Sequence, residues 1–341
     1  MKVLFIGGTG NISASVSRLA VEQGIQLYLL TRGQTPVHIP GARVLTGDIQ
    51  NVSHVQELLS GHQFDAVVNW INYTQDQVER DVHLFAGRTR QYIFISSASA
   101  YQKPVLNPII TEQTPLENPY WEYSRNKIAC ENYLMDAFHN ASFPATIVRP
   151  SHTYDTILPL VLGGGATFTL ADRILRGQPV ILHGDGSSLW TLTHSQDFAR
   201  AFLRLLGNTA AIGEAFHITS DESLTWNQIY LALSEALGVK ARVVHVPSDF
   251  IARVVPDRGP SLLGDKAWSV IFDNTKIKQF VPGWQAVIAF RDGIRATLNW
   301  FQADARRMVI DPKINQDTEK ILAAYRRAYD DPEEIISGWQ P

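Results

Sequence analysis

Residues 3–13 read Val-Leu-Phe-Ile-Gly-Gly-Thr-Gly-Asn-Ile-Ser, and this stretch decides the fold. The apolar run Val3–Ile6 predicts a buried strand, and the three glycines that follow predict a tight turn. From Ser13 to Gln23 apolar residues recur at helical spacing, and Gly24 provides a stop. Strand, glycine turn and helix in this order form the first half of a βαβ unit, whose turn can hold a pyrophosphate at the start of the helix.

The glycine turn fits a dinucleotide-binding fingerprint with one replacement. Gly7 permits the tight turn and Gly10 lets the backbone approach a pyrophosphate, while Ser13 stands where a third small residue is usual. The alternative is an ordinary turn between a strand and a helix. On the first interpretation, cofactor contacts are expected from Gly7, Thr9, Gly10, Asn11 and Ile12.

Short apolar runs alternate with longer amphipathic stretches over the first 150 residues. Strands are predicted at 3–6, 27–30, 66–69, 92–96 and 145–148. This alternation is typical of an α/β fold with a doubly wound parallel sheet and right-handed crossovers, the Rossmann fold.

The rhythm breaks after Pro150, where turn-rich segments begin. Farther on, Thr225 is expected to cap a helix that runs to Leu237, and residues 243–246 to form a strand. We therefore expect a dinucleotide-binding Rossmann domain at 1–150 with return elements at about 192–218, a smaller C-terminal substrate-binding subdomain at 151–191 and 219–304, and a helical extension at 305–341.

Composition excludes several classes of protein. Thirty basic against thirty-three acidic residues give no excess of positive charge for a nucleic acid, so that partner is not expected. Cys130 stands alone, which excludes an internal disulfide and a cysteine zinc site, and no histidine pair has metal-ligand spacing, so no metal is expected. The first apolar run is too short for an export signal and no run is long enough to span a membrane, so we expect a cytoplasmic protein without membrane contact.

The end of the second predicted strand bears on the choice of cofactor. Thr31 replaces the acid that usually accepts hydrogen bonds from an NAD ribose, and Arg32 next to it could pair with a 2′-phosphate. NADP is therefore weakly favoured over NAD, although Arg32 could also be a solvated loop charge. Asp48, followed by Ile49, is placed to accept a hydrogen bond from an adenine amino group, or else to cap the next helix.

A tyrosine and a lysine four residues apart suggest proton transfer. Tyr123 and Lys127 share one face of a predicted helix. A free tyrosine has a pKa of about 10, and a cation within ~4–6 Å lowers it by roughly 1–3 pH units, into the range of a general acid or base. The fourth predicted strand ends in Ser96, and Ser97 and Ser99 follow at its carboxyl end, where ligands bind in such sheets.

Together these residues resemble the extended and atypical short-chain dehydrogenases/reductases, the NAD-dependent epimerase/dehydratase family. The resemblance covers roughly residues 1–290, and its motifs are Gly7-Gly8-Thr9-Gly10, Asp48-Ile49, the run 94–101, Tyr123 with Lys127 and Glu131, Arg149-Pro150 with Tyr154, Gly184-Asp185-Gly186, and His194 with Asp197. It implies that Ser97 is the catalytic hydroxyl, Tyr123 the acid/base and Lys127 the lysine that lowers the tyrosine pKa and binds the cofactor ribose. It further implies cofactor contacts from Trp70 and Pro150, and a possible homodimer, although nothing in the residues specifies an interface.

Two departures narrow the substrate. Trp190 and Thr191 replace the Arg-Asp pair that grips the diphosphate in the sugar-nucleotide enzymes of this family, and Ser97-Ala98-Ser99 replaces the acidic residues of its dehydratases. We expect a sugar-like small molecule, with contacts from Ser97, Ser99, Tyr123, His152 and Trp190. Trp190 could also fill the space of a nucleotide, and Trp70 and Asn72 could be packing residues. His194, like His152, lies in a segment that the family uses near the substrate.

The expected activity is hydride transfer between NAD(P) and a secondary alcohol or ketone. Epimerisation and net reduction would use the same residues, so the sequence leaves both open. Residues 189–200 also resemble the chloroplast stem-loop-binding branch of the atypical members, which gives the alternative of an RNA-binding or regulatory protein without turnover. A cofactor sensor without catalysis is a third alternative.

Overall fold

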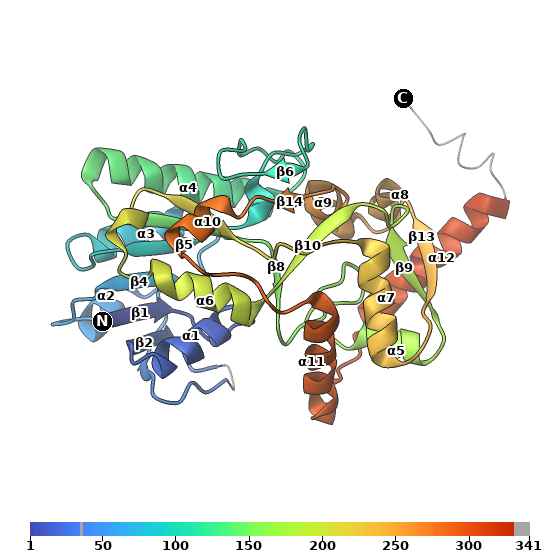
Figure 1. The fold of residues 1–341 in the computed structure, drawn as a ribbon, viewed down its shortest axis with the longest axis horizontal. Coiled ribbons are helices and arrows are strands. Elements are labelled where there is room, and N and C mark those ends of the chain that lie inside the picture. Colours follow the sequence, from blue (N-terminus) through green and yellow to red (C-terminus); the bar gives the residue numbers. More distant parts are fainter. Residues whose placement is uncertain (35–36, 331–341) are drawn as a thin grey trace. The chain divides into compact units, whose positions relative to one another are not determined.

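A seven-stranded parallel sheet organises the first part of the chain (Figure 1). The computed structural model describes residues 1–34 and 37–330. Its strands, in the order β11-β7-β5-β4-β1-β2-β3, are β1 (Lys2–Ile6), β2 (Gln26–Thr31), β3 (Arg43–Thr46), β4 (Ala66–Asn69), β5 (Tyr92–Ile95), β7 (Ala145–Pro150) and β11 (Ala215–Ile218). The predicted parallel α/β sheet is confirmed.

Alternating side chains of the strands bury both faces of this sheet. Val3 and Phe5 of β1 pack with one group of helices, and Leu4 and Ile6 with another, because successive side chains of a strand point to opposite faces. The first face is covered by α1 (Ser13–Glu22), α6 (Ser195–Leu205) and α10 (Thr275–Phe280), and the second by α2 (Val52–Leu58), α3 (Gln75–Phe85) and α4 (Glu122–Ala141) (Figure 1). Strands covered on both sides explain the continuous apolar runs in the sequence.

The strand order reverses at β1. This strand pairs with β2 on one side and with β4 on the other. The chain therefore adds β2 and β3 on one side of β1 first, and the later strands β4, β5, β7 and β11 on the opposite side. In doubly wound sheets the crevice at the carboxyl ends of such strands is where ligands bind. The glycine turn follows β1 at this position.

The chain divides into two compact units. One comprises Met1–Asp155, Thr191–Glu222 and Val270–Ala289. It includes the short parallel pair of β6 (Ile109–Ile110) with β14 (Ile271–Phe272), and the pairing of β8 (His152–Tyr154) with residues 192–194 of β10 (Leu189–His194). The other comprises Thr156–Trp190, Ser223–Ser269 and Phe290–Pro341, of which residues up to 330 are described.

The second unit is mainly helical. Its helices of seven residues or more are α5 (Thr169–Leu175), α7 (Trp226–Leu237), α8 (Ser248–Val254), α11 (Phe290–Gln302) and α12 (Pro312–Asp330), and β9 (Pro179–His183) pairs in parallel with β13 (Arg242–Val246); the short strand β12 is Ser223–Thr225. Thr225 caps α7 in a capping box with Gln228, as the sequence predicts. Within the described ranges, no helix combines the length and apolarity that crossing a bilayer requires.

Candidate functional site

The turn after β1 has a backbone that only glycine adopts readily. Gly7 and Gly8 have φ angles of +92° and +97°, and the N–H of Gly7 donates to the carbonyl of Leu30 at 2.9 Å. A Cβ on Gly8 would lie 2.7 Å from a methyl group of Leu29, and the Ser17 hydroxyl of α1 donates to the Gly8 carbonyl at 2.7 Å. These contacts bring the turn close to both β2 and α1, the tight approach that the glycines predict.

A cavity of about 420 Å³ opens at the carboxyl ends of β1 to β4. Six residues predicted for the cofactor line it: Gly7, Thr9, Thr31, Arg32, Asp48 and Ile49. Asp48 does not cap α2, because Asn51 caps that helix by accepting from His54 N–H; Asp48 instead accepts from the N–H of Gln50 at 2.9 Å. The alternative role for Asp48 is therefore wrong.

The residues around this cavity fit an adenine dinucleotide. The left-handed turn leaves no room for a side chain at Gly7, where a Cβ would meet Ile71 at 3.0 Å, so the backbone itself borders the cavity. Thr31 and Asp48 offer a hydroxyl and a carboxylate, and Arg32 and Arg80 bring two cations to the same wall. Hydroxyl, carboxylate and guanidinium groups are suited to ribose, adenine and phosphate, respectively.

Trp70 does not line the cavity. Its ring packs between Phe5 and Phe202, with ring centroids 5.5 and 5.1 Å away, and its buried Nε1 has no hydrogen-bond partner among the described residues. This placement favours the packing alternative that the sequence left open. Ile71, the next residue, borders the cavity instead.

The remaining predicted cofactor residues of this unit have local structural contacts. The Asn11 amide donates to the carbonyl of Thr153 at 2.9 Å, and Ile12 precedes α1 and packs against the core. The N–H of Gly10 donates to Ser13 Oγ at 2.9 Å, so the serine at the third small position closes the turn. Pro150 is buried as the last residue of β7.

The proton-transfer pair lies on one side of α4. Lys127 Nζ lies 5.7 Å from the ring centroid of Tyr123 and donates to the carbonyls of Asn72 at 2.6 Å and Ile95 at 2.8 Å. The lysine is 3% exposed, and burial lowers its pKa to about 8. The structure thus brings together the predicted pair and places its cation at the ends of β4 and β5.

The predicted serines form a chain of hydroxyl groups. Ser97 Oγ and Ser99 Oγ are 2.9 Å apart, and the Ser124 hydroxyl donates to Ser99 Oγ at 2.8 Å. Ser97 is half-buried, whereas Ser99 is 3% exposed and Ser124 fully buried. Ser97 is therefore the hydroxyl nearest to solvent, and Ser99 is suited to orient it rather than to touch a substrate.

The other predicted substrate residues lie in different places. His152 is half-buried at the start of β8, paired with Leu192 of β10. His194, at the end of β10, accepts from the N–H of Gln196, and burial lowers its pKa. Trp190 belongs to the second unit, is 3% exposed and stacks on Trp226 at 5.4 Å, which favours its space-filling alternative.

Three residues of the site region are absent from the set that the sequence predicts. Tyr73 and Arg80 line the cavity, and Ser124 extends the hydroxyl chain. Arg80 donates to Asp81 at 2.8 Å and to Asn72 at 3.0 Å, so a buried carboxylate holds it. Only Ser124 carries a signal in the sequence, because it follows the predicted catalytic tyrosine directly.

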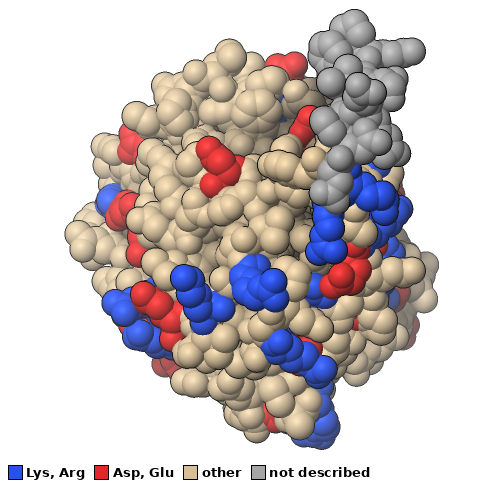
Figure 2. All heavy atoms as spheres, turned by 90° about the vertical axis from the view of Figure 1, so that its right-hand side faces the viewer, with Lys and Arg blue, Asp and Glu red and all other residues tan. Residues whose placement is uncertain are grey.

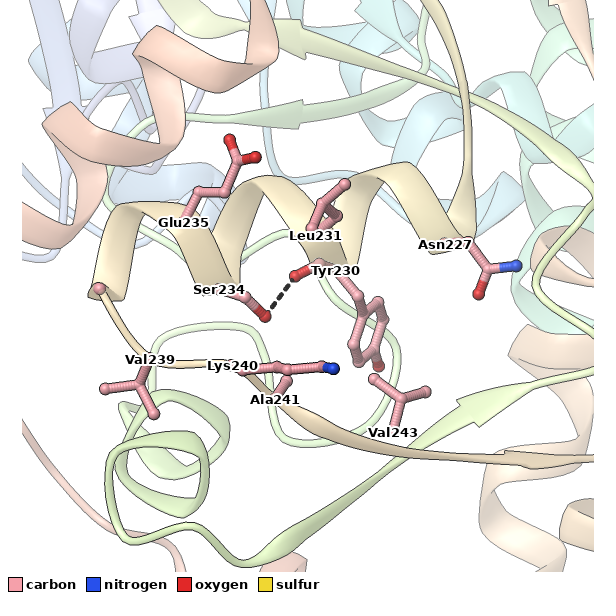
Figure 3. Close-up of a pocket in the computed structure, with 10 residues that line it drawn as sticks. Asn227, Tyr230, Leu231, Ser234, Glu235, Val239, Lys240, Ala241 and Val243 are labelled. Atoms are coloured by element: carbon pink, nitrogen blue, oxygen red, sulfur yellow. Dashed lines mark hydrogen bonds between the residues drawn. The ribbon is translucent and has the colours of Figure 1, made fainter.

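A second cavity lies in the second unit, and its walls are formed largely by apolar side chains (Figure 3). It has a volume of about 450 Å³ and lies between α7 and the segment 239–243. Leu231 and Val243 give it apolar walls, while the Tyr230 and Ser234 hydroxyls donate to backbone carbonyls at 2.9 Å each. The hydroxyl groups of Tyr230 and Ser234 are thus used within the protein, and Asn227, Glu235 and Lys240 are the other polar residues in the lining.

Comparison with known proteins agrees with this geometry. The NAD dependent epimerase/dehydratase family matches residues 3–219. A 2′-dehydrokanamycin reductase of Streptomyces kanamyceticus is 26% identical over 84% of this chain and 80% of its own length, and the chloroplast stem-loop binding protein of 41 kDa b of Arabidopsis thaliana is 29% identical over 73% and 67%. In fold, a UDP-glucose 4-epimerase of Thermotoga maritima solved with UDP-glucose superposes with a TM-score of 0.73 at 20% identity, covering 89% of this chain and 99% of that one. The chain belongs to the NAD dependent epimerase/dehydratase family.

Proposed function

We propose that this protein is an NAD(P)-dependent oxidoreductase or epimerase that acts on a secondary alcohol or ketone of a sugar-like substrate. The observation that carries the proposal is the grouping around α4. A buried lysine lies beside Tyr123, and a hydroxyl chain joins Ser97 to Ser124, the neighbour of Tyr123. Membership of the family supports cofactor binding at the cavity beside the glycine turn.

Each residue has a defined part in the proposed reaction. In the reducing direction, the Tyr123 hydroxyl donates its proton to the substrate oxygen, and Ser97 donates a hydrogen bond to the same oxygen. The Lys127 cation stabilises the phenolate that remains. A bound nicotinamide would supply the hydride, or accept it in the oxidising direction. In the oxidising direction the phenolate takes the proton back, so one set of residues serves both net reduction and epimerisation.

The cofactor is proposed to lie along the turn and the cavity. Gly7 and Thr9 would face the pyrophosphate, and Thr31, Asp48 and Arg32 the adenosine. Arg32 and the absence of an acid at residue 31 favour NADP weakly over NAD. Lys127 has one N–H beyond its two bonds to carbonyl groups, which suits a ribose hydroxyl.

The proposed substrate class rests on the residues at 190–191 and on the relatives. One relative is named for 2′-dehydrokanamycin, whereas the structural neighbour is named for UDP-glucose. The missing Arg-Asp pair at Trp190 and Thr191 favours a sugar-like substrate without a nucleoside diphosphate. Isothermal titration with several sugar nucleotides tests this point, since micromolar binding of any of them would contradict it.

The proposed function is tested by cofactor titration and turnover. We expect NADPH or NADH fluorescence to report binding, and a panel of sugar-like ketones and alcohols to show turnover. Tyr123→Phe should bind the cofactor as before and lose turnover by roughly 10²–10⁴-fold, because it removes the proton donor and little else. Full turnover in this variant would refute the proposed role of Tyr123.

The relative named as a stem-loop binding protein supports a second candidate, RNA binding without turnover. The net charge of −3 opposes it, and on the face shown in Figure 2 basic side chains are interspersed with acidic ones. RNA binding by phosphate contacts would weaken steeply with salt. A mobility-shift assay with a stem-loop RNA at two salt concentrations distinguishes the candidates.

A further inference from the structure

Lys127 is a buried cation that has no carboxylate partner in the part of the chain that the structure describes. None of the ion pairs among the described residues includes it. Its ammonium group instead lies near three aromatic rings, with centroids at 4.7 Å for Tyr73, 4.8 Å for Phe94 and 5.7 Å for Tyr123. A cation within about 6 Å of a ring centroid is attracted by the negative face of the ring, most strongly where water is excluded.

Tyr73 differs from the other two rings. Phe94 belongs to β5 and is fully buried, so it is part of the core, and Tyr123 is the proposed acid/base. Tyr73 lies in the loop between β4 and α3, is 50% exposed, and reaches Lys127 from outside the sheet. Its ring also lies 5.9 Å from that of Tyr123, and its backbone N–H donates to Gln77 Oε1 at 2.7 Å, which holds the loop in place.

We propose that Tyr73 is a positioning residue of the proton-transfer site, whose ring holds Lys127 in its protonated form beside Tyr123. The consequence for catalysis rests on the proposed function, while the contact between ring and cation does not. Tyr73 also lines the cavity beside the glycine turn, so this loop links the cofactor cavity to the reacting pair.

Other charges on the helix α4 do not replace the ring. The charge of Glu131 raises the pKa of Lys127, against the larger effect of burial. The Glu131 carboxylate is bound by Arg149 of β7 at 2.6 Å, which neutralises most of its field. Burial also raises the pKa of Cys130 to about 12, so its thiol is uncharged at neutral pH.

On α3 the buried carboxylate of Asp81 is likewise engaged, whereas Asp76 and Glu79 are exposed to solvent. Asp81 accepts from Asn72 Nδ2 at 2.8 Å and from Tyr92 at 2.7 Å, and it is paired with Arg80 at 2.8 Å. Asn72 donates to Asp81 with its side-chain amide and accepts from Lys127 with its backbone carbonyl. Both groups are neutral, so no charge connects this network to Lys127. Among the described residues, the groups in direct contact with the Lys127 ammonium group are therefore the two backbone carbonyls and the three aromatic rings.

A pair of variants separates the ring from the hydroxyl of Tyr73. Tyr73→Phe keeps the ring, and Tyr73→Leu removes it while retaining an apolar cover. Carbon-13 NMR of the lysine Cε groups, with the Lys127 signal assigned by its loss in Lys127→Met, gives the pKa of Lys127 in each protein. We expect a fall of about one pH unit in Tyr73→Leu and no change in Tyr73→Phe.

The opposite result has a clear physical meaning. If Tyr73 acts mainly by excluding water, its removal would hydrate the ammonium group and raise the pKa. A raised or unchanged pKa in Tyr73→Leu therefore overturns the proposal. Tyr73→Gln is a second variant without a ring, and it should lower the pKa in the same direction.

Turnover gives an independent reading. The alkaline limb of the pH–rate profile should move down by about one pH unit in Tyr73→Leu and stay in place in Tyr73→Phe. If the NMR shift occurs in a protein without turnover, the role of Tyr73 stands and the proposed function fails. If turnover is present and both variants keep the original pKa, the proposed function stands and the role of Tyr73 fails.

Discussion

Replacing Lys127 by methionine tests whether the cation is buried as the structure shows. Methionine has nearly the same length but no charge, so Lys127→Met removes one titrating group from the interior. Burial lowers the pKa of Lys127 from 10.5 to about 8, which at about 1.4 kcal/mol per pH unit corresponds to about 3 kcal/mol. This is the amount by which the charged form is disfavoured relative to the neutral form on folding.

The sign of the pH dependence follows from proton counting. Below pH 8 the folded and unfolded chains both hold the proton, and the full penalty of burying the charge is present. Between about pH 8 and 10.5 the unfolded chain holds a proton that the folded chain has lost, so this group increases the free energy of unfolding as the pH rises. Above 10.5 neither form holds it, and the contribution is constant.

Urea unfolding of the wild type and of Lys127→Met at several pH values between 7 and 11 gives the required free energies. Other groups titrate in the same range, but they do so in both proteins and cancel in the difference. We expect the wild type to gain up to about 3 kcal/mol relative to the variant across this range. Two parallel curves would refute the assignment of Lys127 as a buried cation.

Three further changes have defined outcomes. Arg32→Ala should weaken NADPH binding about tenfold in a fluorescence titration and leave NADH binding unchanged, because one charge-assisted contact to the 2′-phosphate is lost; equal loss for both would contradict this. Glu131→Gln should reduce the free energy of unfolding by about 3 kcal/mol, since it leaves Arg149 buried without its partner charge. The control Arg90→Ala removes an exposed ion pair and should change the free energy of unfolding by less than about 1 kcal/mol. Similar losses in the two variants would count against the burial argument. Burial lowers the pKa of His183 from 6.5 to about 4, so the folded protein should lose up to about 3 kcal/mol of stability as the pH falls through this window, and His183→Gln should lose less in a urea series at pH 7, 5.5 and 4.

Much of the sheet could be predicted because its strands are buried on both faces. Such strands appear in the sequence as continuous apolar runs, as in Val3–Ile6 and Ala66–Val68. The edge strand β3 (Arg43–Thr46) is largely exposed and has only a weak apolar pattern. Strand β11 (Ala215–Ile218) pairs with β7, about 70 residues earlier in the chain, and no local pattern encodes that pairing.

The site divides in the same way between local and tertiary information. The spacing of Tyr123 and Lys127 is a property of one helix, and the structure has both on the same side of α4. Trp70 follows β4 directly, yet neighbouring residues of that loop face opposite ways: Trp70 enters the core and Ile71 borders the cavity. Tyr73 reaches Lys127 because α3, which follows its loop, packs against α4, so the sequence does not reveal that contact.

The choice of aromatic rings around Lys127 follows from what the proposed chemistry requires. A carboxylate beside the lysine would hold the ammonium group charged more strongly than a ring does, but it would also place a negative charge close to Tyr123 and oppose the phenolate that must form there. Rings and backbone carbonyls stabilise the cation through dipoles and quadrupoles, which leave its net charge available to the tyrosine. The acid of α4 that acts on Lys127, Glu131, is held by Arg149 in agreement with this requirement. A buried lysine of lowered pKa, beside a tyrosine and without an ion pair among the described residues, therefore combines a loss of stability with an electrostatic arrangement that favours the proposed proton transfer.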